Sequence, residues 1–173
     1  MSTLVNFAVR AAQIAFAAVV TGLSISISQG HHWGGLPFIL GYVSFVGCVT
    51  LLGAFAGLAA TWVELLQGTI GMLVDAIILV FNLAGGVVLA IKINGVKCAD
   101  DGNTDNAIKL VTNGLFNGGW KGKESYYATQ PDGDKTLLSL CKKNQADAAF
   151  LFLTVVVLLV SLAMGFLRMK KGY

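Results

Sequence analysis

The chain has 173 residues, of which 55% are hydrophobic and only 12% are charged. Soluble domains carry roughly 25% charged residues, so this composition excludes a disordered chain and argues against a soluble enzyme. The net charge of +3 is too small to indicate a nucleic-acid-binding surface, which needs clustered basic residues, and no nucleic-acid partner is predicted.

The charged residues are segregated along the chain. The 81 residues from 11 to 91 contain only two of them, Glu64 and Asp75, whereas residues 94–144 contain 13 of the 21. Long segments that are almost free of charge, next to one polar segment, are typical of membrane spans joined by a water-facing loop.

Four apolar segments follow one another in chain order. They cover about residues 4–28, 36–60, 69–93 and 145–167, and a helix needs about 20 residues to cross a 30 Å hydrocarbon core. Lipid offers no partners to backbone N–H and C=O groups, so these segments must be helices. The sequence therefore predicts an all-α integral membrane protein, a four-transmembrane-helix bundle in a single domain over residues 1–173.

The segment 94–144 is predicted to be one large loop between the third and fourth helices. Cys98 and Cys141 lie near its two ends, at similar heights above the membrane, and a disulfide between them would staple the loop. Disulfides persist mainly on the oxidising side, which favours an extracellular loop and cytoplasmic termini. The seven lysines of the loop argue weakly for the opposite orientation, because the positive-inside rule loses force in long loops.

Short helices are expected within this loop. Residues 106–116 form one candidate, which Gly114 would end, and residues 137–141 form another just before the fourth span. A partly ordered loop is the alternative.

Ionisable side chains within membrane spans are costly and are therefore candidates for function. Arg10 and Asp75 lie at matching depths on the first and third spans, which predicts an ion pair between two helices, with a proton relay or ion site as the alternative. Lys92 and Asp147 also match in depth and are predicted to pair, unless Lys92 extends to the lipid headgroups instead.

Small and polar residues mark predicted helix contacts. The spacing of Gly53 and Gly57 matches the close-approach pattern of membrane helices, and Gly85 and Gly86 lie in the third span. Asn82, at the middle of that span, is expected to form a hydrogen bond between helices. Packing inside the bundle is the first interpretation of the glycines, and contact with a second copy or a partner protein is the alternative.

Catalytic and metal-binding patterns are poorly supplied. The chain has two histidines, His31 and His32, adjacent in one short connector without cysteine or carboxylate support. No phosphate-binding glycine loop or zinc-protease motif occurs. We therefore predict that the protein is not an enzyme and that it has no metal site and no cofactor, although bound lipids are compatible with the spans.

Two stretches carry a resemblance to a known family. One begins at Asp75 and continues through the Ala-Gly-Gly-Val-Val-Leu-Ala segment at 84–90 to Cys98, and the other runs from Cys141 to Phe152. Together with the four-span layout, they resemble the MARVEL-domain tetraspan family, and more narrowly its fungal branch of eisosome-associated non-classical export proteins.

The resemblance implies a plasma-membrane protein without catalysis. Members of the family organise sphingolipid- and sterol-rich membrane domains, so the expected partners are membrane lipids and either a second copy of the chain or another membrane protein. An accessory subunit of a larger membrane transporter, pump or synthase is the first alternative function, and a small channel or transporter is the second.

Overall fold

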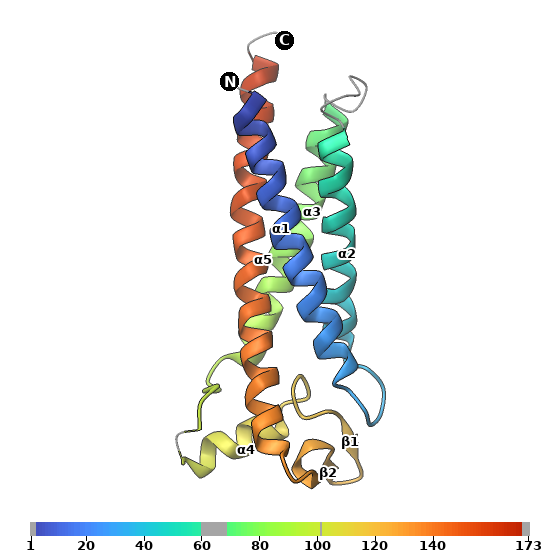
Figure 1. The fold of residues 1–173 in the computed structure, drawn as a ribbon, viewed down its shortest axis with the longest axis vertical. Coiled ribbons are helices and arrows are strands. Elements are labelled where there is room, and N and C mark those ends of the chain that lie inside the picture. The colour runs from blue at the N-terminus through green and yellow to red at the C-terminus, as the bar shows by residue number, and fades with distance from the viewer. Residues whose placement is uncertain (1–2, 60–68, 101, 171–173) are drawn as a thin grey trace.

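The computed structural model describes residues 3–59, 69–100 and 102–170. Long helices lie side by side in one elongated bundle, and a smaller substructure covers one end of it (Figure 1). We call this substructure the cap and define it as residues 94–132 together with the connector 30–37. The two ends of the described chain lie together at the opposite end of the bundle (Figure 1), which we call the terminal end.

The bundle consists of helices that each run antiparallel to the one before. Each is long and apolar enough to cross a membrane, which confirms the predicted number of spans. The predicted end of the second span, at residue 60, lies outside the described residues. The helices are α1 (Thr3–Gln29), α2 (Phe38–Ala59), α3 (Thr69–Ile93) and α5 (Gly133–Lys170).

Helix α5 begins at Gly133 rather than near residue 145 as predicted, so the loop between α3 and α5 covers 94–132 and not 94–144. The predicted short helix at 137–141 is part of α5. Leu137, Leu140 and Asn144 are buried at helical spacing, on the same face as residues deeper in the span. Hydropathy located only the apolar part, because a helix continues wherever one of its faces stays buried. At 1.5 Å per residue, the 38 residues of α5 span roughly 57 Å, nearly twice the hydrocarbon core.

The cap contains one helix, α4 (Thr104–Thr112), where the sequence predicted 106–116. Its N-cap is Asn103, whose side chain accepts a hydrogen bond from the Asp105 N–H at 2.9 Å. It ends at Asn113 rather than at Gly114. The Asn113 side chain turns the backbone by accepting from the Leu115 N–H, and it donates to the Lys92 carbonyl at the end of α3.

A hairpin that the sequence did not predict completes the cap. Its strands β1 (Trp120–Lys121) and β2 (Glu124–Ser125) pair antiparallel and are followed by the short helix η2 (Tyr127–Thr129). Gly119, just before β1, has φ +101°, and a Cβ there would overlap the Trp33 carbonyl. This position therefore requires glycine, because the hairpin lies directly on the connector between α1 and α2.

Hydrogen bonds and aromatic rings hold the connector and the hairpin together. The N–H groups of His32 and Trp33 both donate to the Gly118 carbonyl, at 2.8 and 3.0 Å. The Tyr127 hydroxyl donates to the Gly30 carbonyl at 2.9 Å, and the Tyr126 ring lies 4.4 Å from the His32 ring. Burial, and secondarily the neighbouring Tyr126, raise the pKa of Tyr127 above its ordinary value, so the phenol remains a neutral donor.

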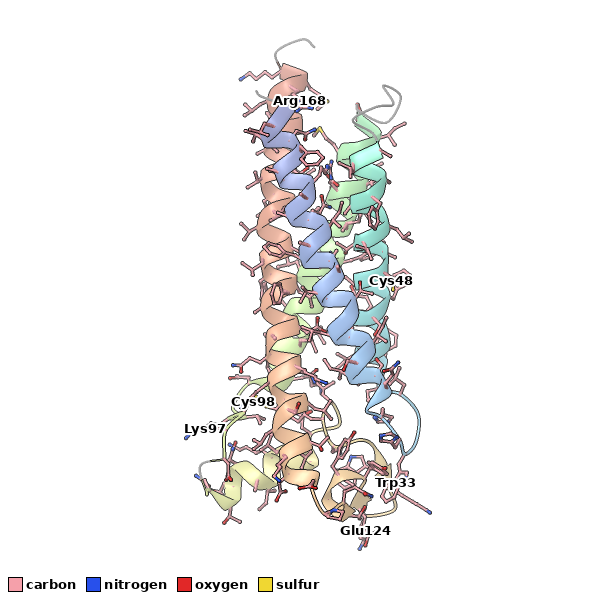
Figure 2. All side chains as sticks on the ribbon, in the orientation of Figure 1. Trp33, Cys48, Lys97, Cys98, Glu124 and Arg168 are labelled. Carbon is pink, nitrogen blue, oxygen red and sulfur yellow. A yellow bond between two sulfur atoms is a disulfide. The ribbon has the colours of Figure 1, made fainter. Side chains whose placement is uncertain are left out.

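The disulfide between Cys98 and Cys141 is formed, as predicted, with Cα atoms 5.5 Å apart. It joins the start of the loop to the part of α5 that extends beyond the predicted span, at the cap end of the bundle where Figure 2 labels Cys98. The third cysteine, Cys48, is a free thiol on the exposed face of α2.

The cap and the bundle share one hydrophobic core. Phe116, in the loop after α4, is fully buried and belongs to the same cluster as Val43 of α2 and Leu151 of α5. The cap is therefore packed onto the helices and is more than a tethered loop.

Replacing the cysteines of the disulfide tests how far the stability of the cap depends on this bond. In the chain-entropy view, a ring of this size contributes about 4 kcal/mol to the free energy of unfolding. We expect Cys98→Ser and Cys141→Ser each to lower stability and to open residues 94–132 to proteolysis, while Cys48→Ser leaves both unchanged. Mass mapping of unreduced peptides checks the bond itself, and free thiols at both positions in the native protein would contradict it.

Candidate functional site

A polar cluster lies inside the bundle near the terminal end. The two terminal nitrogens of Arg10 face the two carboxylate oxygens of Asp75, and each N–O distance is 2.9 Å. The side chains are only 12% and 5% exposed, so this two-pronged pair is shielded from solvent. The structure thus brings together the two charges that matched in depth along the sequence.

Two further residues complete this cluster. Arg10 also donates to the Gln13 side-chain oxygen at 2.8 Å, and the Ser161 hydroxyl donates to Asp75 Oδ2 at 2.8 Å. Gly57 of α2 lies against the guanidinium, where a Cβ would come within 2.7 Å of Arg10 Cζ. All four long helices therefore meet at one ion pair, which we call the four-helix cluster.

The geometry of the four-helix cluster favours a structural role over proton or ion transfer. Both oxygens of Asp75 are occupied by charged or hydroxyl donors, which leaves neither of them free to coordinate an ion. Paired charges also remove the cost of placing either one alone in an apolar bundle. Sequence reasoning missed Gln13 and Ser161, although Gln13 lies one helical turn from Arg10.

Asn82 forms the expected bond between helices. Its amide nitrogen donates to Thr50 Oγ1 of α2 at 2.7 Å and to the Ile78 carbonyl at 2.8 Å. Asn82 is fully buried, so this contact ties α2 to α3 in the middle of the bundle.

The predicted pair between Lys92 and Asp147 is not formed. The Lys92 side chain is exposed beyond the last buried residue of α3, Leu89, whereas Asp147 is buried and faces α1. There, Asp147 Oδ2 accepts from the Ser24 hydroxyl at 2.8 Å, while Oδ1 has no hydrogen-bond partner among the described residues. Matching depth along the sequence was not enough to predict an ion pair, because the Lys92 side chain is exposed whereas that of Asp147 is directed toward α1.

The glycines that were singled out all pack inside the chain. A Cβ on Gly53 would overlap the end of Ile78 on α3, whereas Gly57, one turn later, lies against Arg10 on α1. A Cβ on Gly85 or Gly86 would meet Leu151 at 3.6 Å or the Phe152 ring at 3.2 Å, respectively. The small residues of α2 and α3 therefore let helices of the same chain approach closely.

The outer faces of the long helices are apolar. Large hydrophobic side chains are exposed on every one of them, an arrangement that suits a lipid environment and would be a liability in water. Examples distributed over the helices are Phe7, Phe45, Leu52, Leu73, Val80, Ile91, Val156 and Phe166.

The family model for MARVEL, a membrane-associating domain, matches residues 3–164. The chain belongs to the MARVEL family. The match includes α1, α2, α3, the cap and most of α5, so the four-helix cluster and the disulfide both lie within the domain. This MARVEL protein is therefore a multi-pass membrane protein, of a family that is generally membrane-associated and non-enzymatic. Searches of curated proteins and of solved structures gave no significant match.

A double-mutant cycle on Arg10 and Asp75 tests the four-helix cluster. Removing one partner of a buried ion pair leaves the other charge unpaired and costs about 3–5 kcal/mol. We expect Arg10→Met and Asp75→Asn each to lower the free energy of unfolding in mixed micelles by this amount, and the double variant to lose far less than the sum. The exposed pair Lys135–Asp132 is the control, with an effect of about 0–1 kcal/mol. Additive losses at positions 10 and 75 would contradict direct contact.

Substitution of Gly57 tests the close approach of α2 to the cluster. Gly57→Ala should lower the thermal midpoint, because the added Cβ displaces a guanidinium that two hydrogen bonds and an ion-pair contact hold in place. The control is Gly22→Ala on α1, where nothing lies within 4 Å of the added carbon. The better helix propensity of alanine should leave that variant equally or more stable. Equal effects at the two sites would show that the contact is unimportant.

Proposed function

We propose that this MARVEL protein is a non-enzymatic organiser of the plasma membrane that acts through lateral contacts of its helices with lipids and with other membrane proteins. The observation that carries the proposal is the apolar outer surface of the bundle, with exposed residues such as Phe45, Leu73 and Val156, in a chain of this family. A second copy of the chain is one of the neighbours that this surface would accept.

The inside of the bundle supports the same function. Polar groups there join neighbouring helices. Arg10 forms an ion pair with Asp75, and Asn82 donates a hydrogen bond to Thr50. Asp75, which a small channel or transporter would need as a free group, has both oxygens occupied. The occupied carboxylate therefore favours interaction through the outer surface over transport through the interior.

The orientation that we propose places the cap outside the cell and both termini in the cytoplasm. Disulfides persist mainly on the oxidising side of a membrane, and the Cys98–Cys141 bond lies at the cap end. Basic residues flank the span of α5 at both ends, with Arg168 and Lys170 at the terminal end, where Figure 2 labels Arg168, and Lys142 and Lys143 at the cap end. The disulfide therefore carries this orientation, and the positive-inside rule does not decide it.

The narrower proposal is a role in eisosome-type domains rich in sphingolipid and sterol. It rests on the resemblance of the stretches 75–98 and 141–152 to the fungal branch of the family. In the structure, these stretches include most of α3 and a part of α5 in which Leu151 and Phe152 contact Gly85 and Gly86 of α3.

Reconstitution tests this function and separates it from the two alternatives. In giant vesicles of sphingolipid, sterol and unsaturated phosphatidylcholine, we expect the labelled protein to be enriched in the sterol-rich phase. Even distribution between the phases would contradict lipid-domain organisation. A stoichiometric large partner after purification in mild detergent would favour the accessory subunit, and ion flux above that of empty vesicles would favour the channel.

A further inference from the structure

A basic groove lies between α1 and α5 where the bundle meets the cap. It has a volume of about 520 Å³, and its lining includes Lys135, Lys142 and Lys143 of α5. Leu23 lines the groove from α1 and the other lining residues belong to α5. The two helices stay in contact at this height, where Lys143 bonds Ser26.

The charge of this groove is entirely positive, because its lining contains three lysines and no carboxylate. Lys142 is exposed and has no ion-pair partner in the part of the chain that the structure describes. Lys143 is half-buried, and its ammonium donates to the Ser26 hydroxyl of α1 at 2.9 Å. An ammonium has three N–H donors, so Lys143 is held in position with donors left for a ligand.

Lys135 has a lesser role in the groove. It pairs with Asp132 at 3.0 Å, and both side chains are largely exposed, so their interaction is weak and screened by solvent. The core of the positive charge is therefore the adjacent pair Lys142 and Lys143, which we call the lysine pair.

The height of the lysine pair matches the depth of lipid headgroups. The pair immediately precedes the apolar segment that begins at residue 145, and Leu23 and Ala146 line the same groove. Deeper along this seam, Val19 of α1 and Leu153 of α5 expose apolar side chains. Charge at the water boundary with an apolar surface beneath it is the arrangement that an anionic lipid needs, with its phosphate above and its acyl chains below.

The seam below the groove is closed by direct helix contacts. Phe16 of α1 packs edge-on against Phe150 of α5 with ring centroids 5.8 Å apart, and the Ser24 hydroxyl bonds Asp147. Acyl chains would therefore lie along the outside of the two helices and not between them, while the headgroup occupies the opening at the cap end.

We propose that this groove binds the phosphate of an anionic lipid headgroup, in the leaflet on the cap side, through Lys142 and Lys143. The proposal rests on the lipid-facing role proposed above and gives it a specific ligand chemistry. Lysine binds phosphate as a compact point charge. Each basic residue contributes about 1 kcal/mol at the anionic cytoplasmic surface of a membrane, and we take the same value for each lysine on one bound anionic lipid on the cap side. That energy corresponds to about fivefold in affinity for each lysine.

Lipid retention by the full chain tests this site. The protein is reconstituted in phosphatidylcholine nanodiscs with increasing phosphatidylglycerol, and bound lipid is measured by native mass spectrometry. We expect selective retention of phosphatidylglycerol by the native protein and a loss of about fivefold in affinity for each of Lys142→Gln and Lys143→Gln. The control with the same change in charge is Lys109→Gln with Lys123→Gln, both exposed in the cap and outside the groove lining, which should retain the preference.

The outcomes separate the sources of phosphate and the two proposals. Equal phosphatidylglycerol retention by the native protein and the variant with both groove lysines replaced would overturn the site, provided that the disulfide and thermal midpoint are unchanged. Displacement of the lipid by millimolar inorganic phosphate would show a free-anion site and also overturn it. Enrichment in sterol-rich phases without phosphatidylglycerol preference would refute this site alone, and the reverse result would refute only the organiser function.

Discussion

The ion pair between Arg10 and Asp75 is the interaction on which the bundle depends. Helices in lipid gain nothing from hydrophobic association with each other, so specific packing and polar contacts must fix their register. Here Gln13 and Arg10 of α1, Asp75 of α3 and Ser161 of α5 form one bonded group, and Gly57 lets α2 close over it. Four helices are thereby aligned at a single depth, and no charge of the pair is left facing lipid.

The opposite end of the bundle is fixed by different means. The cap joins the connector after α1 to the loop after α3 through backbone bonds to Gly118 and the Tyr127 hydroxyl. The Cys98–Cys141 bond fastens that loop to α5. Both ends of the bundle are therefore held by specific contacts. The outer apolar faces and the groove at the lysine pair Lys142 and Lys143 are then the surfaces that remain available to lipids and partners.

Burial of a face, and not hydropathy alone, decides where α5 begins. Its first twelve residues are polar enough to be taken for loop, yet Leu137, Leu140 and Cys141 fall on the face that continues into the span. Lys142 and Lys143 belong to this helical extension of α5, so the lysines of the groove have a defined position. Asp147 also shows what hydropathy cannot predict. Its depth in the membrane was evident from the sequence, but the direction of its side chain toward Ser24 was not.

The sequence by itself predicted four membrane helices and the meeting of Arg10 with Asp75, because lipid penalises unpaired charges and unbonded backbone so strongly that few arrangements survive. It also predicted the pairing of Cys98 with Cys141, because both cysteines lie close to the ends of neighbouring spans. Only the tertiary structure decided what depends on the rotation of each helix about its axis. That rotation places Ser161 on Asp75, points Lys92 away from Asp147 and aligns Gly57 with the guanidinium. Hydropathy reports depth in the membrane, whereas direction follows from how side chains of neighbouring helices fit together.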